Sequence, residues 1–176
     1  MNLRPAQADD VATLAAWDEK PHVKWCTGHD PDQPLPPEAQ EGWATEIARN
    51  VDWQEILIGE AEGRPIGVVQ IIDPAREESH YWGKCAPNQR AIDIWIGEET
   101  NIGRGYGTQM MRAAIARCFA DPSVTNILID PLMINVRAIR FYRRLGFADV
   151  GERWFDEDHC LVMELRREDW TPAQVN

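Results

Sequence analysis

The chain has 176 residues, a formal net charge of −11 and scattered cysteines with no Cys-x-x-Cys pair. This size suits one domain, which we place at residues 1–170 with a C-terminal tail over 171–176. The acidity argues against nucleic acid and allows a cationic ligand, while the cysteine and histidine spacing predicts no metal centre. No apolar run approaches the roughly 18 residues that span a membrane, and no signal peptide pattern opens the chain, so we expect a cytoplasmic protein without a membrane partner.

The first half of the chain alternates helical and extended patterns. It predicts a strand over 3–5, a helix from the Asp9/Asp10 cap through Trp17, a proline-rich loop over 28–37, a helix over 38–50, and a hairpin of strands 55–60 and 65–72. The polar segment over 73–88 is long enough to be a functional loop.

The second half predicts a strand over 90–97, a helix over 105–119, a strand over 124–129, a helix over 135–145, and an antiparallel pair over 147–152 and 160–166. The fold class is therefore α/β of the α+β kind, with a mixed, mostly antiparallel sheet of about seven strands and about four helices.

The first functional motif is the turn Ile102-Gly-Arg-Gly-Tyr-Gly-Thr108, which joins an apolar strand to a helix. Glycines let a ligand approach the backbone, and the free N–H groups of a first helical turn attract phosphate. The spacing fits neither the P-loop nor the dinucleotide-binding motif. A phosphate-bearing ligand of another kind is indicated, although such a turn can also be a simple tight corner.

The second motif is Asn135-x-x-Ala-x-x-x-Tyr142-x-x-x-Gly146-Phe147. Asn135 can cap a helix, Tyr142 lies two turns later on the same face, and Gly146 can end the helix. Taken alone, the motif describes a helix cap and a core tyrosine.

Together, the two motifs and the order of elements resemble the GCN5-related N-acetyltransferases over nearly the whole chain. The resemblance implies two central parallel strands that splay apart, with acetyl-CoA as co-substrate. It also implies cofactor-binding residues, which are Arg104, Gly105, Gly107 and Thr108 for the pyrophosphate, the backbone of Ile94, Trp95 and Ile96 for pantetheine, and Asn135. Tyr142 would donate a proton to the leaving thiolate. The family begins the turn with Gln or Arg where Ile102 stands here, which would remove one side-chain contact and keep the backbone cradle.

Further segments resemble the aminoglycoside 6′-N-acetyltransferases. They are Val23-Lys-Trp25, Gly67-x-x-Gln70, Ile92-Asp93, Asp121-Pro-x-Val-Thr125, Asp130-Pro131 and Asn135-x-Arg-Ala-Ile-Arg140. The resemblance implies direct acetyl transfer, in a ternary complex, to an amine of an aminoglycoside antibiotic. The 6′-amino group would be the acceptor, and the reaction would confer resistance.

Acceptor binding requires carboxylates, because the amine is protonated at neutral pH and must lose a proton before it attacks. Asp93 is the candidate base, since it interrupts an apolar strand, where an unpaired charge is costly. Its alternative is an ion pair with Arg90 or with another basic residue at a strand end. Asp130 is a second candidate, or the start of an Asp-Pro turn. The remaining substrate-binding candidates are Glu98, Glu157 (or its neighbour Asp158), Trp25, Trp82 and Gln70.

Three other functions stay open at this point. The chain could acetylate another small amine or a siderophore precursor, it could be a non-catalytic module that binds acetyl-CoA, or, less in keeping with its acidity, it could acetylate protein N-termini. The sequence leaves open whether the protein is a monomer or a homodimer.

Overall fold

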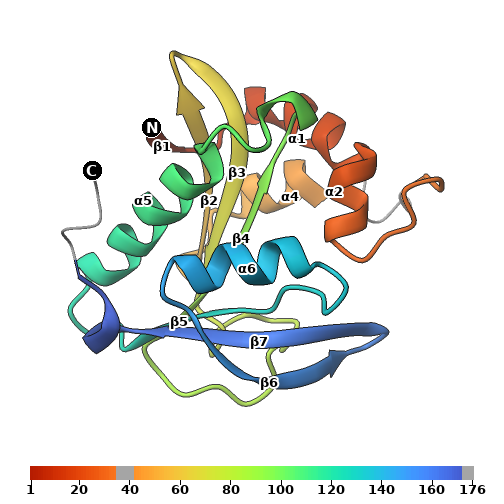
Figure 1. The fold of residues 1–176 in the computed structure, drawn as a ribbon. Helices are drawn as coiled ribbons and strands as arrows, with labels where there is room; N and C mark the ends of the chain where they lie inside the picture. Colours follow the sequence, from red (N-terminus) through yellow and green to blue (C-terminus); the bar gives the residue numbers. More distant parts are fainter. Residues whose placement is uncertain (35–41, 172–176) are drawn as a thin grey trace.

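The computed structural model describes residues 1–34 and 42–171. Its centre is a seven-stranded sheet in the order β1-β2-β3-β4-β5-β7-β6 (Figure 1). The strands are β1 (Asn2–Pro5), β2 (Gln54–Ala61), β3 (Arg64–Ile72), β4 (Gln89–Ile96), β5 (Asn126–Ile129), β6 (Ala148–Phe155) and β7 (Asp158–Arg166). All neighbouring strands pair antiparallel except β4 and β5, which pair parallel. The predicted mixed, mostly antiparallel sheet is confirmed.

The β2–β3 hairpin follows from its turn. Glu62 and Gly63 both have positive φ, 53° and 72°, as a two-residue turn with the twist of the flanking strands requires. The predicted antiparallel pair of the last two strands is confirmed, and β7 lies between β5 and β6, which leaves β6 at the edge of the sheet. Residues 73–88 connect β3 to β4 without a helix or strand, as predicted.

Five α-helices lie within the described residues: α1 (Val11–Asp18), α2 (Pro21–Cys26), α4 (Gly42–Arg49), α5 (Tyr106–Ala120) and α6 (Val136–Arg144). The expected number of about four omits α2, a six-residue helix that begins with proline at its first position, where the missing N–H costs nothing. Part of the loop predicted over 28–37 and the first residues of the helix predicted over 38–50 lie outside the described residues. No helix in the described ranges is long and apolar enough to cross a membrane.

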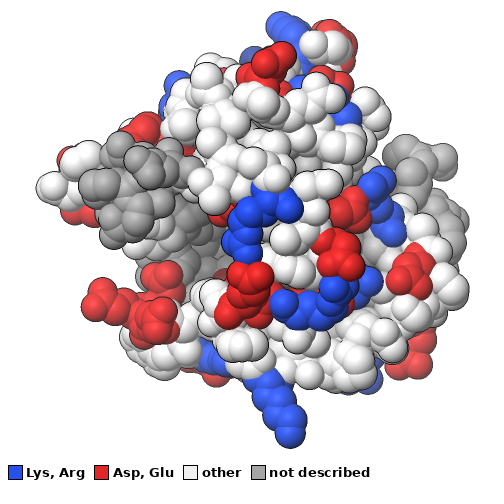
Figure 2. Space-filling model, turned by 180° about the vertical axis from the view of Figure 1, so that it is seen from behind, with Lys and Arg blue, Asp and Glu red and all other residues white. Residues whose placement is uncertain are grey.

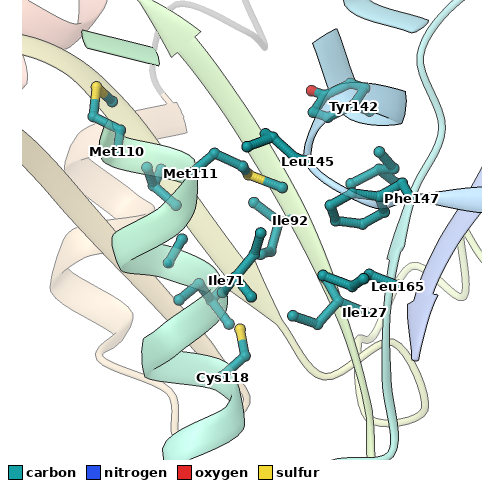
Figure 3. Close-up of a cluster of buried hydrophobic side chains, with 14 of the residues drawn as sticks. Ile71, Ile92, Met110, Met111, Cys118, Ile127, Tyr142, Leu145, Phe147 and Leu165 are labelled. Atoms are coloured by element: carbon teal, nitrogen blue, oxygen red, sulfur yellow. The ribbon is translucent and has the colours of Figure 1, made fainter. Parts of the chain in front are cut away.

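The helices divide between the two faces of the sheet. α5 and α6 cover the near face in Figure 1, where Ile92 of β4 packs with Met111 of α5 and Leu145 after α6 (Figure 3). On the other face, Trp17 of α1 and Trp43 of α4 pack against β2 and β3. Because successive side chains of a strand point to opposite faces, β4 presents isoleucines to the α5–α6 face and Asp93 to the α1–α4 face.

Candidate active site

The two parallel strands part halfway along β4. β4 and β5 are in register over three residue pairs, the last being Ala91 with Leu128, and β4 then continues along β3 to Ile96. The chain leaves β5 after Ile129 and enters the Asp130-Pro131 segment. The strands are thus splayed, as the sequence resemblance implied, and no strand of the described ranges pairs with the C-terminal half of β4 on its β5 side.

Backbone groups of two residues face this opening. The N–H of Gly97 donates to Ile66 O on β3, and consecutive residues of a strand direct their backbone groups to alternate sides. The groups of Ile94 and Ile96 therefore face the opening, where His22 lies 3.0 Å from Ile96 O. The backbone of Trp95 faces β3 instead, so its predicted pairing with pantetheine is not available in this structure.

The glycine-rich turn has the conformation of an anion cradle. Gly103 and Gly105 have φ of 81° and 84°, and a methyl group added to either would meet no atom within 4 Å, so space above the turn is open. The first intrahelical bond of α5 runs from Gln109 N to Gly105 O. The N–H groups before it, among them those of Gly107 and Thr108, have no partner within the helix and suit a pyrophosphate.

The second motif forms a helix cap and places a buried tyrosine near the opening. Asn135 Oδ1 accepts the Ala138 N–H at 3.0 Å, so the capping alternative is correct, and its contact with the cofactor stays a prediction. Tyr142 is a buried residue of α6, and Figure 3 shows its hydroxyl on the side of the ring toward β4. Burial, followed by the charges of Asp93 and Asp130, raises the Tyr142 pKa above its ordinary value of 10.0, which keeps the phenol protonated.

Two carboxylates meet on the opposite side of the opening. Asp93 is opposite Gln70 on β3, and burial, with the charges of Glu77 and Glu46, raises its pKa. Burial and the charge of Asp93 raise the Asp130 pKa as well. Arg90, the alternative partner of Asp93, instead lies 3.6 Å from carboxylate oxygens of Asp73 and of Asp121. Among the residues that the structure describes, no cation forms an ion pair with Asp93, and its raised pKa of about 6 lets it accept a proton near neutral pH.

The loop before β4 closes this side of the site. Tyr81 Oη donates to Asp130 Oδ2 at 2.6 Å, and its ring stacks on Phe155 at 4.4 Å. Trp82 also packs on Phe155 and is only 6% exposed, so its predicted contact with substrate does not fit this structure. Tyr81, which is 42% exposed, is the aromatic residue of the loop that a ligand can reach.

The remaining predicted substrate residues lie at different places. Trp25 is exposed on α2, and Gln70 accepts a hydrogen bond from Gln54 Nε2 at 2.7 Å beside Asp93. Glu98 forms an ion pair with Lys20 at 3.2 Å. Glu157 lies in the exposed turn between β6 and β7, so its predicted role is not supported by its position.

Asp158, the alternative to Glu157, lies closer to the site. Its charge contributes to the raised Asp130 pKa, and its carboxylate approaches the loop after α2 so closely that a methyl group on Gly28 would lie 2.6 Å from either oxygen. The tip of the β6–β7 hairpin thus meets the α2 loop next to Asp130.

Three acidic residues of this region were not predicted. Asp18 at the end of α1 accepts a hydrogen bond from Trp43 Nε1, and burial raises its pKa to about 6. Glu46 on α4 also has a raised pKa because of burial. Glu77 has one fully buried carboxylate oxygen without a hydrogen-bond partner in the described structure. They come from three separate segments, and no local pattern marks them.

Comparisons with known proteins agree with this geometry. A model of the acetyltransferase (GNAT) domain matches residues 6–155, so the chain belongs to the GNAT acetyltransferase family. The chain is 30% identical over 155 residues to the aminoglycoside N(6′)-acetyltransferase type 1 of Klebsiella pneumoniae, which covers 86% of this chain and 75% of that protein. A kanamycin resistance protein of Rhizobium radiobacter is 38% identical over 76 residues, which cover 43% of this chain and 70% of that protein.

The solved structures give the same result. The aminoglycoside acetyltransferase AAC(6′)-Ib in complex with coenzyme A superposes with a TM-score of 0.83 at 28% identity, over 96% of this chain and 95% of that one. Its complex with coenzyme A and kanamycin has a TM-score of 0.82 at 27% identity, with the same coverage. The predicted family and fold are confirmed.

Proposed function

We propose that this protein transfers the acetyl group of acetyl-CoA to an amine of an aminoglycoside, at the 6′-amino group. The observation that carries the proposal is the opening between β4 and β5, with a protonated Tyr142 on one side and the Asp93–Asp130 pair on the other. The similarity to aminoglycoside acetyltransferases supports the acceptor class.

The open glycine turn and the first N–H groups of α5 fit the pyrophosphate of acetyl-CoA, and the free backbone of Ile94 and Ile96 fits the pantetheine arm. The thioester then lies at the opening, where the acyl carbon can be reached from the Asp93 side. A backbone N–H of Ile94 or Ile96 would polarise the thioester carbonyl.

The reaction needs one base and one acid. Asp93 takes a proton from the ammonium group, directly or through water, and the amine nitrogen attacks the thioester carbon. The C–N bond forms, the C–S bond breaks, and Tyr142 protonates the departing sulfur. Both groups have raised pKa values, which makes Asp93 a usable base near neutrality and Tyr142 a phenol that still holds its proton.

The acidic surroundings favour an acceptor with several charges. Besides burial, the charges of Glu77 and Glu46 raise the pKa of Asp93, and the charges of Asp93 and Asp158 raise the pKa of Asp130. A ligand with several ammonium groups would relieve this repulsion, whereas a single amine would relieve only part of it. An aminoglycoside satisfies this requirement, and a siderophore precursor or a peptide N-terminus does so less well.

The test is a thiol-release assay with kanamycin, spermidine and a peptide amine, followed by NMR of the product. We expect kcat/KM for kanamycin to exceed that for the peptide amine by about 100-fold or more and that for spermidine, which has one ammonium group fewer, by about tenfold, with acetyl on the 6′-nitrogen, since each charge contact contributes about tenfold. Asp130→Asn should lower this preference, while Asp149→Asn, which removes a surface carboxylate paired with Arg143, should not. Transfer to spermidine alone would contradict the proposal that an aminoglycoside is the acceptor. No transfer to any of the three amines would indicate a non-catalytic module.

A further inference from the structure

Asp130 is a partly buried carboxylate without a cation. On the face of the molecule shown in Figure 2, several acidic side chains lie directly beside basic ones. Asp130 differs, because no Lys, Arg or His of the described ranges forms an ion pair with it. The groups that face it come from β4, β7 and the β3–β4 loop: Asp93, Asp158, Cys160 and Tyr81. Burial raises the pKa of the Cys160 thiol to about 12, so this group carries no charge at neutral pH.

Tyr81 gives Asp130 a hydrogen bond that favours its charged form. Burial and then the charge of Asp93 raise the Asp130 pKa to about 7, and the bond from Tyr81 Oη to Asp130 Oδ2, 2.6 Å long, acts in the opposite direction. Burial also raises the Tyr81 pKa above its ordinary value of 10.0, so the phenol keeps its proton and remains a donor. Tyr81 therefore opposes the protonation of Asp130.

Strand β6 holds the Tyr81 ring in place. The ring lies parallel to that of Phe155, with the two centroids 4.4 Å apart and the two planes 9° apart. Phe155 in turn packs edge-on against Trp82 and lies under the Arg153 guanidinium, whose carbon is 4.5 Å from the ring centroid. Arg153 Nη1 also donates to Trp82 O at 2.9 Å. These contacts fix the loop at Tyr81, so little further ordering is needed for its hydroxyl to reach Asp130.

The bond leaves room for a ligand. It occupies Oδ2 of Asp130, while Oδ1 receives no hydrogen bond from any side chain of the described residues. Tyr81 itself is 42% exposed, so this carboxylate and its donor lie where a ligand can reach them. An ionised carboxylate binds an ammonium group more strongly than a protonated one does, because its hydrogen bond is assisted by charge.

We propose that Tyr81 is a positioning residue, which keeps Asp130 ionised and fixes the direction of its carboxylate for an ammonium group of the acceptor. Tyr81 acts through Asp130 and takes no part in bond breaking. Without its hydroxyl, Asp130 would be protonated at neutral pH and would bind the acceptor only at higher pH. The inference rests on the proposed function as regards the acceptor, whereas the ionisation of Asp130 can be measured with no acceptor present.

The first measurement is a ¹³C NMR titration of protein labelled at its aspartate carboxyl carbons, with the Asp130 signal assigned from Asp130→Asn. Tyr81→Phe keeps the ring and its stack on Phe155 and removes the hydroxyl. We expect this variant to raise the midpoint of Asp130 by about one pH unit, since a charge-assisted hydrogen bond is lost. An unchanged midpoint would overturn the proposal.

Ser123→Ala is the matched control, because Ser123 Oγ donates to Asp121 Oδ1 at 2.7 Å, a bond of the same kind in an exposed turn. This bond lowers the Asp121 pKa, so the control should raise the midpoint of Asp121 and leave that of Asp130 unchanged. A control that raises the Asp130 midpoint as much as Tyr81→Phe does would also overturn the proposal.

The second measurement is the ratio of kcat/KM for kanamycin between Tyr81→Phe and the wild type, as a function of pH. We expect about one tenth below about pH 6, where the ionised fractions of Asp130 differ about tenfold, and a value near one above about pH 9. Protonation of the amine is the same for both proteins and cancels. A ratio that is equally low at every pH would indicate a merely structural role and would contradict the proposal. If neither protein acetylates kanamycin, the proposed function fails, and the NMR titration still decides the role of Tyr81.

Discussion

Replacing Asp93 by asparagine should make the protein less active and more stable. The substitution keeps the shape of the side chain and removes its charge. Loss of the general base should lower kcat by about 10² to 10⁴-fold. The stability should change in the opposite direction, because the native structure holds this carboxylate in a site that disfavours its charge.

The size of the gain follows from the pKa. Burial and neighbouring carboxylates raise the Asp93 pKa from 3.8 to about 6, and each pKa unit corresponds to about 1.4 kcal/mol. The full shift would destabilise the native state by about 3 kcal/mol. Because neighbouring carboxylates can take up part of the same proton, the expected gain in the free energy of unfolding is about 1–3 kcal/mol. Since the native state holds the proton more tightly than the unfolded state, wild-type stability falls as the pH rises through this range. The gain should thus be absent below about pH 4 and complete above about pH 7.

Urea unfolding of both proteins at about pH 5 and about pH 8 measures this effect, alongside steady-state kinetics. Asp149→Asn is the control, because its carboxylate pairs with Arg143, which lowers the Asp149 pKa, so its loss should give no gain. An Asp93→Asn protein that is less stable than wild type at about pH 8, or that turns over at the wild-type rate, would refute this reasoning.

Three further predictions test other parts of the site. Tyr142→Phe should lower kcat by about 10²-fold with little change in the dissociation constant of acetyl-CoA, and equal turnover would remove Tyr142 as the acid. Gly105→Ala should weaken coenzyme A binding about tenfold in a calorimetric titration, because its φ of 84° costs alanine about 1–2 kcal/mol, whereas Gly151→Ala should not. The kcat/KM for the acceptor should fall as the pH is lowered through about 6. Asp130→Asn should lower the midpoint of this pH profile, since it removes a neighbouring negative charge. An unchanged midpoint would show that the charge of Asp130 does not act on the titrating group.

The cofactor half of the site was predictable from sequence because it is local. The glycine turn and the helix after it lie within a few residues, and Asn135 and Tyr142 belong to one helix, so spacing predicted where they lie, while the resemblance to the acetyltransferases implied their roles. Asp93 was found because a charge within an apolar strand is unusual. The helix α2 was missed, although Pro21 after Lys20 is a recognisable helix start.

The acceptor half of the site was less predictable because tertiary contacts assemble it from distant parts of the chain. Asp18, Glu46 and Glu77 come from α1, α4 and the β3–β4 loop, and only folding brings their charges near the sheet. Trp82 and Tyr81 are neighbours with opposite environments, one buried and one exposed, and composition does not distinguish them. The sequence did not show which way the backbone of Trp95 points, because the alternation of backbone groups depends on the register with β3.

The central claim is that one opening between β4 and β5 receives the thioester from the α5–α6 side and the amine from the Asp93 side. The most direct test is the affinity of a conjugate that joins the sulfur of coenzyme A to the 6′-nitrogen of kanamycin through an acetyl linker. We predict that the wild-type protein binds this conjugate at least about 100-fold more tightly than coenzyme A, and that Asp93→Asn loses most of this advantage. A conjugate that binds no more tightly than coenzyme A alone would contradict the claim.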